Sequence, residues 1–205
     1  MNTTLSRINF ENTLTNSEFN SKTEKYLEST DINTLNDSDR NFYEFTKLNV
    51  HRVNRIIKTY KVSEELKEII EAIDHRQTWL ILTEAWCGDS AQNLPYIAKM
   101  AELNKNINLI IMERDKNLET MDLYLTNGKS RSIPKLIVFD EEGNEKFQWG
   151  PRPKEAQELV HSLNKEGLLK AAINENLHFW YAKNRGKNIE QELKELLVNC
   201  FEAVN

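Results

Sequence analysis

One turn between a predicted strand and a predicted helix constrains this chain more than any other feature. The apolar run at residues 78–83 (T-W-L-I-L-T) favours a β-strand and leads directly into residues 84–90 (E-A-W-C-G-D-S). A helix is predicted to follow and to reach about Leu103. Open α/β sheets bind ligands where a strand ends and the next helix begins. We therefore expect an α/β sheet with a functional site around Cys87.

The remaining apolar pattern surrounds this unit with further strands and helices. The predicted order is two helices (42–60 and 63–73), the strand at 78–83, the helix to 103, a strand at 107–112, a helix at 118–125, strands at 135–139 and 145–149, and three helices (153–164, 168–181 and one capped by Asn188). Because a helix joins the first two strands, we expect them to be parallel with a right-handed crossover. The last two strands are separated only by a turn, so an antiparallel hairpin is expected.

The chain ends differ from the centre in composition. Residues 1–39 are rich in Asn, Thr, Ser and charge, which predicts a loosely attached arm with a helical turn at 23–28. We divide the chain into an N-terminal arm with helices that pack on the core (1–75), the core (76–166) and a C-terminal helical hairpin (167–205). We expect all three to form one compact domain.

Composition excludes several classes of protein. The chain has 205 residues, of which 29% are charged, and a formal net charge of −5. A nucleic-acid binder would normally show a basic face, so no nucleic-acid partner is expected. No apolar run approaches the roughly 20 residues of a membrane span, so no membrane partner is expected. The N-terminus does not have the pattern of a signal peptide, and we expect a cytoplasmic location.

Metal and cofactor sites are also not expected. The chain has only two cysteines, Cys87 and Cys200, which cannot form a disulfide scaffold. Its four histidines show no ligand spacing, and no glycine-rich phosphate loop occurs. Cys200 lies on the apolar stripe of a predicted helix, where free cysteines are commonly buried, so we expect it to pack rather than react.

Cys87 is the residue most suited to chemistry. Unpaired N–H groups and the helix dipole at a helix N-terminus stabilise a thiolate, which is the nucleophilic form of cysteine. Gly88 next to it lets the chain turn and another backbone approach closely. A small buried structural cysteine is the alternative interpretation.

These residues resemble a known family. Trp86-Cys87-Gly88 resembles the W-C-G-P-C site of thioredoxins, and Pro95 stands where their active-site helix contains a proline. Residues 131–139 (R-S-I-P-K-L-I-V-F) resemble the strand entry that carries the thioredoxin cis-proline. The resemblance covers about residues 77–164 and implies a thioredoxin-like fold, a central mixed sheet flanked by helices, with N- and C-terminal helical extensions. The sequence resembles one bacterial branch of this family more closely. That branch has a single-cysteine W-C-G-D motif, then S-I-P-K-L, then W-G-P-R-P, as at residues 149–153 of this chain.

The resemblance implies a second site element opposite the cysteine. The Ile133–Pro134 bond is expected to be cis, with Pro134 in contact with Cys87. Ile133 and Pro134, together with Trp86, Gly88 and Asp89, would then shape a substrate groove. An ordinary trans turn proline is the alternative.

The departures from the thioredoxin pattern concern the release step. Ser90 replaces the second cysteine, so no internal thiol can resolve a mixed disulfide, although its hydroxyl can bond the Cys87 sulfur. Ile81 replaces the buried acid that assists that second thiol. Asp89 replaces a proline, and two interpretations of it remain open. Its carboxylate opposes thiolate formation at Cys87, or it is an acid that the first helical turn favours and has no chemical role. Lys135 either adds positive charge to the site or is solvated.

The sequence therefore predicts a monothiol thiol–disulfide oxidoreductase. Cys87 would be the nucleophile and Ser90 its catalytic neighbour, with no cofactor or metal. The partners would be a protein or a low-molecular-weight thiol or disulfide. Two alternatives remain open: a binding module that has lost turnover, and a glutathione-linked, single-cysteine protein of the glutaredoxin type.

Overall fold

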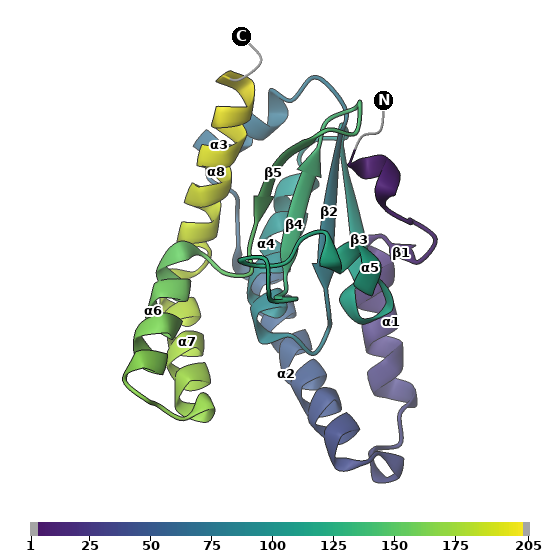
Figure 1. Cartoon of the computed structure of the whole chain (residues 1–205), viewed down its shortest axis with the longest axis vertical. Helices are drawn as coiled ribbons and strands as arrows, with labels where there is room; N and C mark the ends of the chain where they lie inside the picture. The colour runs from purple at the N-terminus through teal and green to yellow at the C-terminus, as the bar shows by residue number, and fades with distance from the viewer. Residues whose placement is uncertain (1–3, 203–205) are drawn as a thin grey trace.

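The structure is a computed structural model that describes residues 4–202 and the side chains as far as Cys200. Its centre is one five-stranded sheet in the order β1-β3-β2-β4-β5 (Figure 1). The strands are β1 (Thr13–Leu14), β2 (Gln77–Thr83), β3 (Ile107–Glu113), β4 (Lys135–Phe139) and β5 (Glu145–Trp149). β2 and β3 are parallel, whereas β4 runs antiparallel to both β2 and β5. These pairings confirm the predicted crossover and hairpin.

Helices cover both faces of the sheet. They are α1 (Asn16–Ser29), α2 (Asp37–Thr59), α3 (Glu64–Glu71), α4 (Gly88–Ala101), α5 (Leu118–Asp122), α6 (Lys154–Lys165), α7 (Lys170–Asn184) and α8 (Lys187–Glu202). One core joins α2, α3, α4 and α8 to the sheet face that carries Trp79, Ile81 and Leu136. The other core joins α5 and the N-terminal segment to the face that carries Leu80 and Leu82. Successive side chains of a strand point to opposite faces, so a continuous apolar strand serves two cores.

The N-terminal segment is more ordered than the composition predicts. β1 pairs antiparallel with the edge strand β3, and α1 follows directly. Thr15 and Glu18 form a reciprocal capping box at the start of α1. Local capping and two buried anchors, Ile8 (7% exposed) and Phe19 (6% exposed), fix a segment of low overall hydrophobicity. The expectation of a loose arm was therefore wrong over the described part.

The C-terminal helices follow the predicted order with one correction. α7 ends at the left-handed residue Arg185, next to Gly186, as expected. α8 already begins at Lys187, so Asn188 lies inside its first turn and is not its N-cap. α6 and α7 pack against each other, whereas α8 runs along β5 (Figure 1). None of the helices within residues 4–202 combines the length and apolarity that crossing a membrane requires.

Candidate functional site

Cys87 stands at the junction of β2 and α4, as the N-cap residue of that helix. Its thiol donates a hydrogen bond to the Ile133 carbonyl oxygen over 3.4 Å. The Ile133–Pro134 peptide is cis, as the family resemblance implies. Cys87 and Ile133 are both buried and belong to the same hydrophobic cluster. The structure thus brings together the two elements that lie 46 residues apart in the sequence.

Burial decides the protonation of this thiol. It raises the pKa of Cys87 above the ordinary value, and the negative charge of Asp89 raises that pKa further. The Ser90 hydroxyl and the N–H groups of Ser90 and Asp89 lower the Cys87 pKa, but by less than burial and Asp89 raise it. The resting site therefore holds a protonated thiol, consistent with its role as hydrogen-bond donor to Ile133.

Ser90 lies in the first turn of α4, three residues after Cys87. Its side chain is 3% exposed, and its Oγ has no partner with full hydrogen-bond geometry among the described residues. The hydroxyl is nonetheless close enough to the sulfur to favour the thiolate. Ser90 is thus placed to respond when Cys87 ionises.

Asp89 is the centre of a buried polar network. Its carboxylate forms an ion pair with Arg152 over 2.6 Å and accepts a hydrogen bond from the Tyr181 hydroxyl over 2.8 Å. Asn93 donates to the Asp89 carbonyl and to the Tyr181 hydroxyl. Burial raises the pKa of Asp89, whereas Arg152, Tyr181 and Arg52 lower it. The hydrogen-bond and ion-pair partners Asn93, Tyr181 and Arg152 come from α4, α7 and the loop after β5. The network therefore links the C-terminal helices to the turn between β2 and α4.

The loop after β5 approaches the same site from the other side. Its Gly150–Pro151 peptide is also cis, which the sequence reasoning did not anticipate. Gly150 has φ +113°, and a Cβ atom there would lie 2.2 Å from the Pro134 carbonyl oxygen. Only glycine permits so close an approach. The W-G-P-R-P motif therefore packs its backbone on the Pro134 loop and directs Arg152 to Asp89.

Two further side chains, Arg52 of α2 and His178 of α7, border Gly88. A Cβ atom on Gly88 would lie 3.2 Å from the His178 ring and 3.5 Å from the Arg52 guanidinium. Burial and the Arg52 charge lower the pKa of His178 to about 4, so this imidazole is neutral at neutral pH. Arg52 also donates to Asn49, which in turn donates to the Ala85 carbonyl just before the motif.

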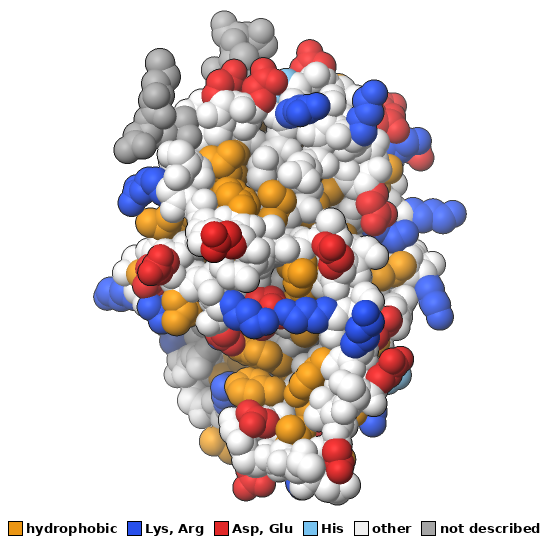
Figure 2. Space-filling model, turned by 90° about the vertical axis from the view of Figure 1, so that its right-hand side faces the viewer, with side chains coloured by type: hydrophobic (Ala, Val, Ile, Leu, Met, Phe, Trp, Pro, Cys, Tyr) orange, Lys and Arg blue, Asp and Glu red, His pale blue; other side chains and the backbone are white. Residues whose placement is uncertain are grey.

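Trp86 forms the exposed side of the site. Its ring lies 5.1 Å from the Phe42 ring, and the Arg114 guanidinium lies 5.1 Å from its centroid. Phe42 is 41% exposed, so this part of α2 offers apolar surface beside the motif. The face that carries α1 and α5 shows hydrophobic side chains gathered below a row of basic ones (Figure 2).

Glu84 is a buried acid that the sequence reasoning overlooked. Its carboxylate accepts the Asp115 N–H over 2.8 Å, which holds the loop after β3 against the end of β2. Burial raises the pKa of Glu84 to about 7, and the nearby charges of Asp115 and Glu113 add to this shift. This group titrates near neutral pH three residues before Cys87.

All seven predicted site residues lie around this turn. They are Trp86, Cys87, Gly88, Asp89 and Ser90 on the β2–α4 side, and Ile133 and Pro134 on the β4 side. Of the two alternatives for Lys135, the solvated side chain is wrong, because this residue is only 6% exposed. Burial also lowers the pKa of Lys135. Cys200 is half-buried and packs against the main core, as predicted.

Several network residues were missed. They are Arg52, Tyr181, His178 and, within a motif that was noticed, Arg152. The arginine in W-G-P-R-P was the one available signal, because the motif itself resembled the bacterial branch. Arg52, Tyr181 and His178 lie on helices without any local pattern that distinguishes them from surface or core residues.

Comparison with known proteins identifies the family of this chain. A family model described as thioredoxin matches residues 36–166, well over half of the chain. The chain belongs to the thioredoxin family. The match begins just before α2 and ends just after α6, so α1, α7 and α8 lie outside it. A comparison with curated proteins gave no significant match.

Two solved structures share the thioredoxin-like fold. The chain matches a protein of unknown function from Pseudomonas aeruginosa with a TM-score of 0.53 and 18% identity, over 94% of this chain and 99% of that one. It also matches an HIV epitope scaffold with a TM-score of 0.55 and 20% identity, over 76% of this chain and 90% of that one. At these identities the likeness extends to the fold alone, and it confirms the predicted fold class. The division of the chain at residues 75 and 166 stays a prediction.

Proposed function

We propose that this protein is a thiol–disulfide oxidoreductase with one nucleophilic cysteine, Cys87. We assign it to a bacterial branch of the thioredoxin family with the C-G-D-S motif, acting in the reducing cytoplasm. One observation carries the proposal: the Cys87 sulfur lies at the N-terminus of α4 and bonds the Ile133 carbonyl beside Pro134. This arrangement joins an activatable sulfur to a backbone segment that a bound chain can pair with.

The proposed reaction is thiol–disulfide exchange in two steps. The Cys87 thiolate attacks one sulfur of a protein or low-molecular-weight disulfide, forms a mixed disulfide and releases the other sulfur as a thiolate. An external thiol then attacks the substrate-derived sulfur of this mixed disulfide. The new disulfide leaves, and Cys87 recovers its thiolate. The second step must be intermolecular, because Ser90 occupies the position of a resolving cysteine.

The neighbouring side chains divide the remaining tasks. Ser90 and the first N–H groups of α4 stabilise the developing thiolate. Trp86, Ile133 and Pro134 contact the substrate, whereas the missing side chain of Gly88 lets His178 and Arg52 lie close to the turn. Asp89 opposes ionisation of Cys87 and is itself held by Arg152, so this pair is a positioning element that sets the reactivity of the thiol.

A non-catalytic binding module is the second candidate. The burial of Cys87, at 9% exposure, and its raised pKa favour this function, since both slow nucleophilic attack. In that case the groove at Trp86 and Pro134 would bind an extended segment without exchange.

Reaction with oxidised glutathione distinguishes the two candidates. We expect wild-type protein and the Cys200→Ser variant to form one glutathione adduct, and the Cys87→Ser variant to form none. Added reduced glutathione should remove the adduct. Turnover with a dithiol-recycling reductase should stay poor. An absent adduct on native protein would favour the binding module, and efficient turnover would show that an internal thiol resolves the intermediate.

A further inference from the structure

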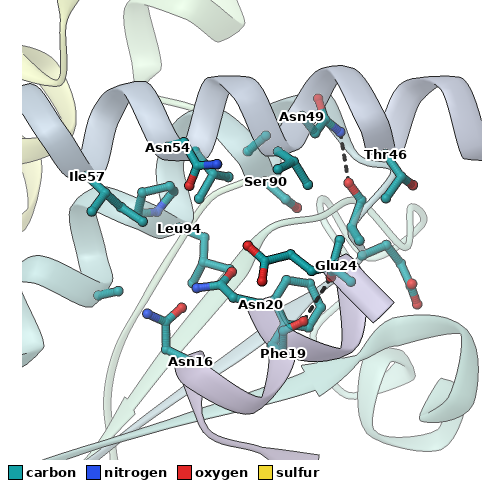
Figure 3. Close-up of a pocket in the computed structure, with 18 of the residues that line it drawn as sticks. Asn16, Phe19, Asn20, Glu24, Thr46, Asn49, Asn54, Ile57, Ser90 and Leu94 are labelled. Atoms are coloured by element: carbon teal, nitrogen blue, oxygen red, sulfur yellow. Dashed lines mark hydrogen bonds between the residues drawn. The ribbon is translucent and has the colours of Figure 1, made fainter. Parts of the chain in front are cut away.

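A pocket of about 220 Å³ lies behind the active-site turn, between α1, α2 and α4 (Figure 3). α1 forms one wall, and this helix lies outside the residues that match the thioredoxin family. The pocket is separate from the Trp86 surface, because neither Trp86, Cys87 nor Pro134 lines it. It is therefore a feature of this chain's N-terminal extension.

The deep part of the pocket combines apolar walls with one unpaired hydroxyl. Phe19, Val53 and Leu94 supply apolar surface from α1, α2 and α4. Ser90 lines the same pocket and is 3% exposed, and its Oγ, although near the Cys87 sulfur, has no partner with full hydrogen-bond geometry among the described residues. A buried hydroxyl without a partner is unfavourable unless something else bonds it. This Oγ is the first indication of a ligand.

The outer part of the pocket is rich in hydrogen-bond acceptors. The Glu24 side chain reaches from α1 into the pocket, and the amides of Asn20 and Asn54 face the same space (Figure 3). No hydrogen bond or ion pair to the Glu24 carboxylate is present in the described part of the chain. Glu102 and Lys99 also line the pocket, and the Glu84 carboxylate accepts a hydrogen bond from the Asp115 N–H. Carboxylates therefore outnumber cations around the opening.

We propose that this pocket binds a small primary amine that carries a compact apolar group. The apolar group would pack on Phe19, Val53 and Leu94, and the ammonium would bond the Glu24 carboxylate and the asparagine oxygens. A polar atom at the deep end would satisfy Ser90. Small-molecule sites generally combine apolar walls with a few convergent polar groups in this way. A ligand there would contact the first turns of α4, directly behind the Cys87 sulfur.

Titration of the full chain with tyramine, whose phenol hydroxyl can reach Ser90, followed by NMR of the backbone amides, tests the proposal. 3-(4-Hydroxyphenyl)propionate is the matched probe with opposite charge, and 2-(4-hydroxyphenyl)ethanol is the neutral one. We expect saturable shifts for amides of α1 and α4 with tyramine, weaker binding of the alcohol and none of the acid. If the acid binds as well as the amine, or if no probe saturates, the proposal is overturned.

Two substitutions in α1 localise the ammonium. Glu24→Gln should weaken tyramine binding about fivefold, the equivalent of about 1 kcal/mol for a partly exposed ion pair. Glu28→Gln removes the same charge one turn away, outside the pocket lining, and should leave the affinity unchanged. Equal weakening by both would show a general charge effect and would overturn the site.

A third substitution separates this proposal from the proposed function. Cys87→Ser abolishes any exchange chemistry, but it should bind tyramine as wild type does, because Cys87 does not line the pocket. Loss of binding in this variant would mean that the probe binds at the Cys87 thiol and not in the pocket, and it would overturn the assignment of the pocket.

Discussion

Arg152 Nη2 lies 2.6 Å from Asp89 Oδ2, which joins the W-G-P-R-P loop to the first turn of the active-site helix. The pair is largely buried, since the side chains of Arg152 and Asp89 are 23% and 10% exposed. Tyr181 completes it from α7. The charge nearest to Cys87 in sequence is thus set by a residue 63 positions away in the chain, and the reactivity of the thiol depends on the packing of the C-terminal helices.

Asp89→Asn should make Cys87 more reactive. Removing the carboxylate takes away one cause of the raised Cys87 pKa and leaves Arg152 as an unpaired cation nearby. The pH profile of iodoacetamide alkylation should therefore shift to lower pH. Stability should fall by up to about 3 kcal/mol, the low end for a broken buried ion pair, because Arg152 keeps some exposure.

Asp122→Asn is the matched control for that measurement. Asp122 pairs with Arg131 on the surface, with both side chains nearly half exposed. Its removal should leave both the alkylation profile and the stability nearly unchanged. An unaltered profile for Asp89→Asn would mean that burial alone sets the Cys87 pKa.

Ser90→Cys should form a disulfide with Cys87 on mild oxidation. Residues 87 and 90 lie three positions apart at the start of α4, so their side chains are on one face. Bridging requires Cβ atoms within roughly 3.5–4.5 Å, which this spacing suits. The variant should also gain disulfide-reductase turnover over wild type. Intact-mass measurement before and after reduction checks the bridge, with Ser90→Ala as the control that cannot form it.

A second change should increase that gain. Ile81 is fully buried in β2 where thioredoxins have an acid, so proton transfer from the new thiol lacks assistance in Ser90→Cys. Adding Ile81→Asp should raise reductase turnover further, at a loss of several kcal/mol in the free energy of unfolding. If residues 87 and 90 do not bridge at all, the thioredoxin-like geometry of the turn is wrong.

Gly150→Ala should disrupt the site from the loop side. Its Cβ would lie 2.2 Å from the Pro134 carbonyl oxygen at φ +113°, so backbone must move. We expect a loss of about 3 kcal/mol or more and faster alkylation of Cys87 as the Ile133 carbonyl is displaced. Gly128→Ala is the comparison: φ is +66° but no atom lies within 4 Å, so only about 1 kcal/mol should be lost. Equal losses, measured by urea unfolding, would contradict the close approach.

Glu84→Gln should change how stability depends on pH. The folded-state pKa of Glu84 is about 7 against an ordinary value of 4.5, so the folded chain holds a proton that the unfolded chain releases. Wild-type stability should therefore fall between pH 4.5 and 7 through this group. Glutamine can still accept the Asp115 N–H and carries no charge, so the variant should be more stable by about 2 kcal/mol at pH 8, after allowance for solvent screening. Urea unfolding at pH 4 should show no such difference, and a gain at both pH values would point to another cause.

The local pattern of the chain was sufficient for most of the fold. The apolar run at 78–83 followed by W-C-G-D-S predicts a buried strand that turns into a helix, because both signals lie within a dozen residues. The same holds for the hairpin at β4 and β5. β1 and most of α1 were missed, since they depend on a two-residue edge pairing and a capping box rather than on an apolar stripe; the predicted helical turn at 23–28 covers only the later part of α1.

The sequence by itself determined where Cys87 stands and that Ser90 occupies the position of the second thioredoxin cysteine, because these depend only on which side chains follow Trp86. The tertiary structure decided the ionisation of the Cys87 sulfur. Burial against Ile133, the Asp89–Arg152–Tyr181 network and the position of His178 over Gly88 all involve residues far apart in the chain. A helix N-terminus lowers a cysteine pKa through local N–H groups, but desolvation and neighbouring charges depend on what packs around it. In this protein the packed environment outweighs the local one, and the resting thiol stays protonated.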